Sequence, residues 1–146
     1  MIVSKIIGNI SSFDCKGKTI DKVKVSAEDR LKQIIRLKSD SGIEIGVNLQ
    51  EGHLHNGDIL GEDDKSIFVV DFLPQNVLLI TPKDMMQMGF VAHSIGNRHT
   101  PAVFEEGAMI VEEDYLLIEW LEANKVPYQK AQKVLKCALK HASHHH

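Results

Sequence analysis

Short apolar stretches run through the first half of the chain, and their spacing predicts strands rather than helices. Ile and Val recur with partial alternation in IVSKIIGNI, KVKVS, LKQIIRLKS, IEIGVNL and SIFVVDF, a pattern typical of half-buried strands. Turn-forming residues separate some of these segments, most clearly at Ser39–Gly42 and Asn56–Asp58. Before residue 80 no stretch shows an apolar period of 3.6 over the length of a helix. We therefore expect a small, mostly β domain with antiparallel pairing.

In the second half, strand-like and helix-like segments alternate. NVLLIT predicts a strand, and after it apolar residues recur at helical spacing, at Met85, Met88, Val91, Ala92 and Ile95. Thr81 is suited to be the N-cap of this helix and Pro82 its first residue, while Gly96 is suited to end it. Two strands are predicted in AVFEEGAMIVEE, then a helix capped by Asp114 in DYLLIEWLEANKV and a last strand in PYQKAQKVLKCALK.

The resulting order, β-α-β-β-α-β, is that of a ferredoxin-like domain. The predicted fold class is therefore α+β, with a small antiparallel β domain followed by a ferredoxin-like domain. Pro74 interrupts two apolar strands and indicates the boundary between the two. We expect a mostly β domain over residues 1–73, a ferredoxin-like domain over residues 76–140 and a histidine-rich tail over residues 141–146.

Composition narrows the classes of function. The 146 residues carry a net charge of −3 and have a pI near 6.2, which gives no electrostatic attraction to nucleic acid or anionic lipid. No apolar run reaches the roughly 18 residues of a membrane span, and the first residues lack a signal-peptide cleavage pattern. Cys15 and Cys137 are far apart and form no CxxC motif, which favours a reduced, cytoplasmic protein. We therefore expect neither nucleic acid nor membrane as a partner.

The sequence lacks a Walker-A loop, GxSxG, HExxH and zinc-ribbon cysteine spacing, so we expect a protein that is not an enzyme. Histidines stand out instead, because half of the eight lie in the last six residues, at His141, His144, His145 and His146. Imidazole suits Ni, Zn and Cu, so this tail is a candidate collector of such ions. A remnant of an expression tag, or a merely solvated tail, is the alternative. His53 and His55, in EGHLHNGD, lie at a predicted turn, where histidines are usually solvated.

His99, in SIGNRHTP, is the candidate for a defined site. It lies between the helix-ending Gly96 and Pro101, which fixes its backbone. One histidine cannot hold a metal ion, but in a two-fold dimer a residue near the axis meets its own copy. A local hydrogen-bonding role is the alternative. Asn97 and Arg98 are expected to position the loop, Asn97 by taking the left-handed backbone conformation after the helix and Arg98 by binding a carboxylate or an interface carbonyl.

The loop IGNRHTP resembles the signature loop of the urease accessory metallochaperone family UreE. SGIEIGVNL and LHNGDIL resemble the N-terminal β domain of that family, and the βαββαβ half and the histidine-bearing C-terminus are similar to its layout. The resemblance implies a peptide- or protein-binding N-terminal domain and a ferredoxin-like domain that forms a head-to-head homodimer. It implies that His99 meets its mate at the interface and binds Ni(II), with auxiliary ligands among His141, His144, His145 and His146.

The resemblance also implies delivery of nickel to apo-urease for assembly of its active site, with the urease accessory GTPase and the apo-urease complex as partners. Zn(II) and Cu(II) are the expected competitors, since ligand affinity alone does not select nickel. Which tail histidines coordinate, and whether metal assembles the dimer into tetramers, stays open. The alternative function is a protein- or peptide-binding adaptor whose metal binding is only an incidental property of the tail.

Overall fold

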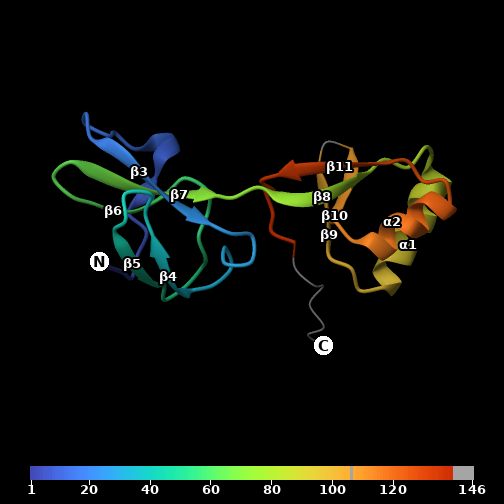
Figure 1. The fold of residues 1–146 in the computed structure, drawn as a ribbon, viewed down its shortest axis with the longest axis horizontal. Coiled ribbons are helices and arrows are strands. Elements are labelled where there is room, and N and C mark those ends of the chain that lie inside the picture. The colour runs from blue at the N-terminus through green and yellow to red at the C-terminus, as the bar shows by residue number, and fades with distance from the viewer. Residues whose placement is uncertain (106, 140–146) are drawn as a thin grey trace. The chain divides into compact units, whose positions relative to one another are not determined.

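The structure is a computed structural model, and it describes residues 1–105 and 107–139. The chain divides into two compact units, Met1–Leu73 and Pro74–His146, and each folds around hydrophobic clusters of its own. The first unit, blue to green in Figure 1, is built almost entirely of strands, whereas the second contains both α-helices. This confirms the α+β class with a β unit first and an α/β unit second.

The N-terminal unit consists of short strands and one turn of 3-10 helix, η1 (Ile10–Ser12). The strands are β1 (Ile2–Val3), β2 (Gly8–Asn9), β3 (Thr19–Val25), β4 (Ile34–Lys38), β5 (Glu44–Asn48), β6 (Asp58–Glu62) and β7 (Ser66–Phe72). They form two sheets, with the strand orders β1-β5-β4 and β2-β6-β7-β3. The alternation of buried and exposed residues along the strands shows which face of each strand lies in the hydrophobic core. Val23 and Val25 of β3 are buried and alternate with exposed residues of that strand. The two valines share one hydrophobic cluster with Ile45 of β5 and Phe68 of β7.

The pairing of these strands is mixed, so the expectation of purely antiparallel pairing is wrong in two places. β1 pairs with β5 and β3 pairs with β7 in parallel. Both pairs join strands that are distant in the sequence, and such crossovers permit parallel pairing, which a tight hairpin cannot give. The neighbouring pairs β4–β5 and β6–β7 are antiparallel, as expected for strands joined by turns.

The C-terminal unit has the β-α-β-β-α-β order that the sequence predicts. Its elements are β8 (Gln75–Ile80), α1 (Met85–Asn97), β9 (Ala102–Glu105), β10 (Ala108–Glu112), α2 (Tyr115–Ala123) and β11 (Tyr128–Lys133). The sheet is antiparallel throughout and has the order β11-β8-β10-β9. In this order the first and third strands of the unit lie side by side in the centre, which is the ferredoxin-like arrangement.

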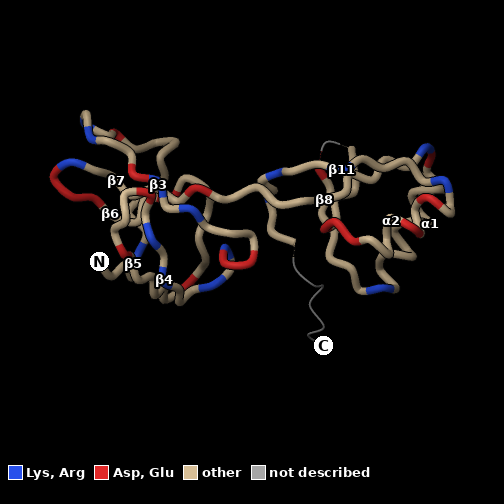
Figure 2. The backbone as a smooth tube through the Cα atoms, in the orientation of Figure 1, with Lys and Arg blue, Asp and Glu red and all other residues tan. Residues whose placement is uncertain are grey.

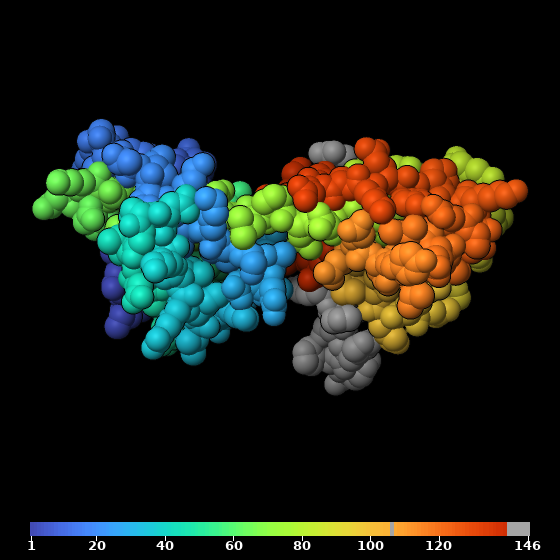
Figure 3. Space-filling model, in the orientation of Figure 1, coloured from blue at the N-terminus to red at the C-terminus, as the bar shows by residue number. Residues whose placement is uncertain are grey.

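Both helices bury one apolar stripe against the sheet. Val91 and Ile95 of α1 pack with Leu117 and Leu121 of α2 in the main hydrophobic cluster of the unit. The spacing of four residues puts each pair on one helix face. Other apolar residues of the sheet, among them Val77, pack in a separate cluster with the segment that follows β11. α2 and β11 are also joined by the Tyr128 hydroxyl, which donates to a Glu122 carboxylate oxygen over 2.7 Å, and both segments lie at the surface in Figure 3.

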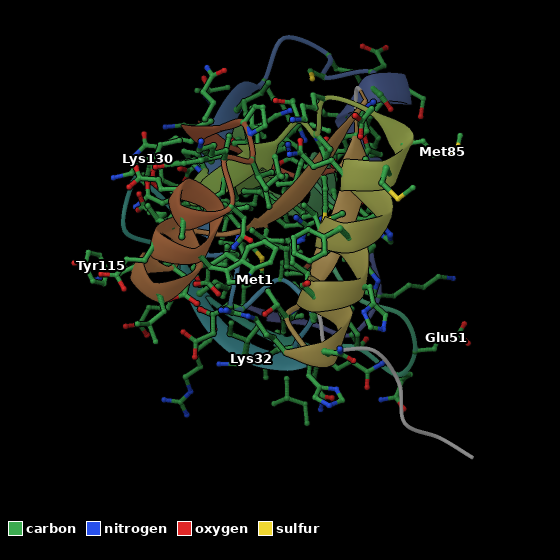
Figure 4. The ribbon with its side chains drawn as sticks, turned by 90° about the vertical axis from the view of Figure 1, so that its right-hand side faces the viewer. Met1, Lys32, Glu51, Met85, Tyr115 and Lys130 are labelled. Carbon is green, nitrogen blue, oxygen red and sulfur yellow. The ribbon has the colours of Figure 1, made fainter. Side chains whose placement is uncertain are left out.

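The start of α1 differs from the prediction. The N-cap is Asp84, whose carboxylate accepts from the Gln87 N–H over 2.7 Å, whereas Thr81 and Pro82 lie outside the helix. A carboxylate at this position satisfies an otherwise unpaired N–H of the first turn. The sequence predicts Met85 in the buried stripe, but Met85 is 89% exposed. The helix begins at this residue, so no preceding turn of α1 continues the stripe there. Figure 4 shows its side chain pointing outward.

Charges of both signs are distributed over both units (Figure 2), in keeping with the small net charge. Within the described ranges, neither α1 nor α2 is long and apolar enough to cross a membrane.

Candidate metal centre

His99 lies in the turn that closes α1. Arg98 caps the helix with φ −83° and ψ −3°. The His99 N–H donates to the Gly96 carbonyl over 3.0 Å, and the Thr100 N–H donates to the Ile95 carbonyl over 3.2 Å. These two bonds form a Schellman motif, the common way in which the last carbonyls of a helix find partners.

His99 occupies the position of this motif that glycine usually takes. Its φ is 56°, in the left-handed region, which costs an ordinary L-residue about 1–2 kcal/mol. Histidine is one of the few residue types enriched there. The residue is exposed, and the hydrogen bonds of the helix end fix its backbone. The result is an accessible ring on a fixed main chain.

The expected roles of Gly96 and Asn97 at this turn are wrong in detail. Both are helical residues, and the left-handed residue comes two positions after Asn97. The reason is that the helical hydrogen bonds continue past Gly96, since the Arg98 N–H still donates to the carbonyls of Ser94 and Ile95, each over 3.2 Å. The sequence signal of a helix-ending glycine therefore marks the end of α1 too early.

Arg98 ties the end of α1 to α2. Its guanidinium carbon lies 5.6 Å from the centroid of the Trp120 ring, within the range of a cation–π contact. Trp120 in turn stacks on Phe90, with ring centroids 5.4 Å apart. This aromatic pair and its arginine fix the helix end next to His99. The sequence prediction gave Arg98 a carboxylate or carbonyl partner and missed the tryptophan.

The side of α1 that turns away from the sheet carries a continuous exposed stripe. Its members recur at helical spacing and are Met86, Gly89, Phe90, His93 and Gly96. Met86 is 83% exposed and Phe90 51%. A Cβ built on Gly89 or Gly96 would meet no described atom within 4 Å, so packing within the chain does not require glycine there. Each glycine nevertheless costs a helix about 0.5–1 kcal/mol relative to alanine.

The remaining predicted ligands cannot be placed next to His99. His141, His144, His145 and His146 all lie outside the described residues. In the described part of the chain, no group of three or more His, Cys, Asp or Glu side chains is arranged to hold a metal ion. One copy of the described chain therefore does not supply a complete ligand set at this loop.

Both units match models of one protein family. Residues 3–73 match the N-terminal domain of the UreE urease accessory protein, and residues 75–146 match its C-terminal domain. The chain belongs to the UreE urease accessory protein family. This confirms the resemblance that the IGNRHTP loop indicates.

Curated UreE relatives are similar over their whole length. Urease accessory protein UreE of Bacillus cereus is 47% identical over 150 residues, covering 100% of this chain and 99% of the relative. UreE proteins of Geobacillus kaustophilus and Staphylococcus saprophyticus are 42% and 40% identical, with the same coverage. No large insertion or missing domain therefore separates the chain from these UreE relatives.

Proposed function

We propose that the protein is a nickel metallochaperone that binds Ni(II) at His99 in a dimer interface and delivers it to apo-urease. Membership of the UreE family supports a role in urease maturation. The observation that carries the proposal is His99 itself, an exposed imidazole on a left-handed residue that the helix end holds in place. The left-handed conformation costs more free energy for histidine than for glycine, so the presence of histidine at this position favours a function for its side chain.

A homodimer supplies the ligands that one chain lacks. In a two-fold contact, a residue near the axis faces its own copy, so two His99 rings would offer two nitrogen ligands of a type that suits Ni(II). The exposed stripe of α1 supports this face as the contact. Its two glycines would let a second helix approach closely, and its exposed Met86 and Phe90 would be buried by that approach.

The tail histidines complete the proposed site. His141, His144, His145 and His146 are proposed as auxiliary ligands from a segment that follows the ferredoxin-like domain. A site of imidazoles and water, without thiolates, keeps open positions, so an incoming ligand can add before an old one leaves. Gly96, Asn97 and Arg98 are proposed as positioning residues, because they hold the helix end from which His99 projects.

The N-terminal unit is proposed to bind protein surfaces. Ile2 of β1 and Ile34 of β4 are 85% and 73% exposed, and these two strands are the edges of one sheet. Exposed apolar side chains on sheet edges favour contact with another polypeptide. The proposed partners are the urease accessory GTPase and the apo-urease complex, in the cytoplasm. Zn(II) and Cu(II) are proposed as competing ions, since selectivity must come from geometry and docking rather than from affinity.

Calorimetric titration of Ni(II) into the full chain and into His99→Ala tests the proposal, with molar mass measured by light scattering. We expect the intact protein to be a dimer with a tight binding phase that His99→Ala loses. Lys125→Ala is the matched control, since it changes the left-handed residue at the end of α2 without touching a histidine or the exposed stripe of α1, and it should keep that phase. A chain ending at residue 140 should bind with lower affinity or capacity. Unchanged binding by His99→Ala would overturn the proposal and leave the adaptor function as the better explanation.

A further inference from the structure

Two histidine rings in the N-terminal unit lie next to each other. His53 and His55 belong to the segment between β5 and β6, and their ring centroids are 4.7 Å apart with a tilt of 33°. Leu54 between them is fully buried in the core of the unit. The two neighbours of this anchored residue are therefore held at the surface, His53 half-buried and His55 exposed.

The backbone around this pair is fixed by buried polar groups. Asp58 is 6% exposed, and its carboxylate accepts from the His55 N–H over 2.7 Å and from the Asn9 side chain over 3.2 Å. The side-chain oxygen of Asn56 accepts from the Phe72 N–H over 2.9 Å. The loop is thus bound to β2 and β7 by its own side chains, and it does not depend on either imidazole.

Each imidazole has a partner on its Nδ1 side. His53 Nδ1 lies 3.0 Å from the Leu54 carbonyl oxygen. Because a carbonyl only accepts, Nδ1 carries the hydrogen and Nε2 of the neutral ring holds the lone pair. His55 Nδ1 lies 3.7 Å from an Asp58 carboxylate oxygen, which favours the same tautomer. A carbonyl or carboxylate behind one ring nitrogen, with the other nitrogen outward, is the arrangement of histidines that bind metal ions.

We propose that His53 and His55 form a second metal site, which binds one late first-row divalent cation through their two Nε2 atoms. With metal–nitrogen bonds of about 2.1 Å, two imidazoles bound at about 90° to one another, as in square-planar or octahedral sites, have centroids about 4.5–5 Å apart. The observed 4.7 Å lies in this range. Cu(II) should bind more tightly than Ni(II) or Zn(II), following the general order for such ligands.

This site takes its remaining ligands from water. The described residues contain no third His, Cys, Asp or Glu that completes a metal-binding group, and the Asp58 carboxylate is engaged by Asn9 and the His55 backbone. Two protein ligands make an open and exchangeable site, weaker than a closed one. The proposal goes beyond nickel binding at His99, and it holds or fails whether or not His99 binds metal.

NMR spectra of the ¹⁵N-labelled full-length protein titrated with Cu(II) test the site, because a bound paramagnetic ion broadens the amide signals nearest to it. We expect broadening of the signals of residues 52–58 once Cu(II) exceeds the amount that the tighter His99 site takes up, in the intact protein and also in His99→Ala. The variants His53→Ala and His55→Ala should each raise the Cu(II) concentration at half-broadening at least tenfold, because one imidazole cannot chelate. His93→Ala is the matched control and should leave the titration unchanged.

The substitutions should leave the loop folded, since the loop bonds use the His55 backbone and not its ring. Unshifted amide signals of Leu54 and Phe72 in the metal-free variants check this. The proposal is overturned if residues 52–58 keep sharp signals at several equivalents of Cu(II), when the tighter histidine ligands are already filled. It is also overturned if both alanine variants titrate like the intact protein, or if the broadening disappears in His99→Ala.

Discussion

Replacing His99 by glycine should make the fold more stable while removing the proposed metal ligand. The residue has φ 56°, and this conformation costs a residue with a Cβ about 1–2 kcal/mol. The greater freedom of glycine in the unfolded chain opposes the gain by about 0.5–1 kcal/mol. The net expectation for His99→Gly is a stabilisation of about 0.5–1 kcal/mol, which corresponds to a rise in Tm of about 1–4 °C for a chain of this size.

Lys125 provides a matched control, because α2 ends in the same way as α1. Lys125 has φ 55°, its N–H donates to the Glu122 carbonyl over 3.1 Å, and the Val126 N–H donates to the Leu121 carbonyl over 2.9 Å. These bonds form a second Schellman motif. Lys125→Gly should therefore raise Tm by a similar amount but leave Ni(II) binding unchanged, whereas His99→Gly should lose it.

A second control should move stability in the opposite direction. Glu119→Gly places glycine on the exposed face of α2, where it should lower stability by about half a kcal/mol because of its poor helix propensity. All variants are compared by thermal unfolding with a chelator present and at equal protein concentration, since dimers have concentration-dependent Tm values. A lower Tm for His99→Gly than for the intact protein would refute the reasoning from backbone strain.

Three further outcomes are expected. Gly89→Arg places a long charged side chain on the proposed dimer face of α1 and should give a folded monomer by light scattering. The control variant Gln129→Arg, at an exposed position of β11, should remain dimeric. Ni(II) affinity measured by calorimetry should be clearly lower at pH 5.5 than at pH 7.5, because protons compete with the metal ion for the imidazole lone pair; equal affinities would exclude a histidine site. Burial of Asp21 raises the pKa of its carboxyl, but hydrogen bonds from Ser41 and Ser39 outweigh this and lower the pKa below the ordinary 3.8. The stability it gives is present above pH 3.8 and is lost as pH falls through the lowered pKa. Ser41→Ala should therefore cost about 1–3 kcal/mol in urea unfolding at pH 7 and less at pH 2.5, and a loss independent of pH would contradict this assignment.

Much of the fold follows from the sequence because each element has a strong local signal. Val91 and Ile95 recur at helical spacing and are buried, and the β-α-β-β-α-β order of the second half is the observed one. The parallel pairs β1–β5 and β3–β7 could not be predicted in this way. They join segments that are distant along the chain, and nothing in the local pattern of either strand encodes its partner.

The sequence singles out His99 as the candidate residue, but it does not predict the backbone geometry of that residue. Histidine before a proline and after a glycine marks a helix end, yet the left-handed conformation falls on His99 rather than on Asn97. The outcome depends on how far the helical hydrogen bonds continue, which glycine propensity alone does not determine. The cation–π contact of Arg98 with Trp120 likewise depends on the packing of α1 against α2.

The geometry of the helix end meets two demands that the proposed role as a metal carrier places on its ligand. A ligand buried in the core would be well positioned but would exchange its ion slowly, whereas a ligand on a loose loop would exchange freely but bind weakly. The main-chain hydrogen bonds from His99 to Gly96 and from Thr100 to Ile95 fix the backbone at His99. The residue itself is exposed. The backbone is fixed and the imidazole is accessible. The proposed ligand can therefore be held in place for binding and still be reached by the ligand that next takes the ion.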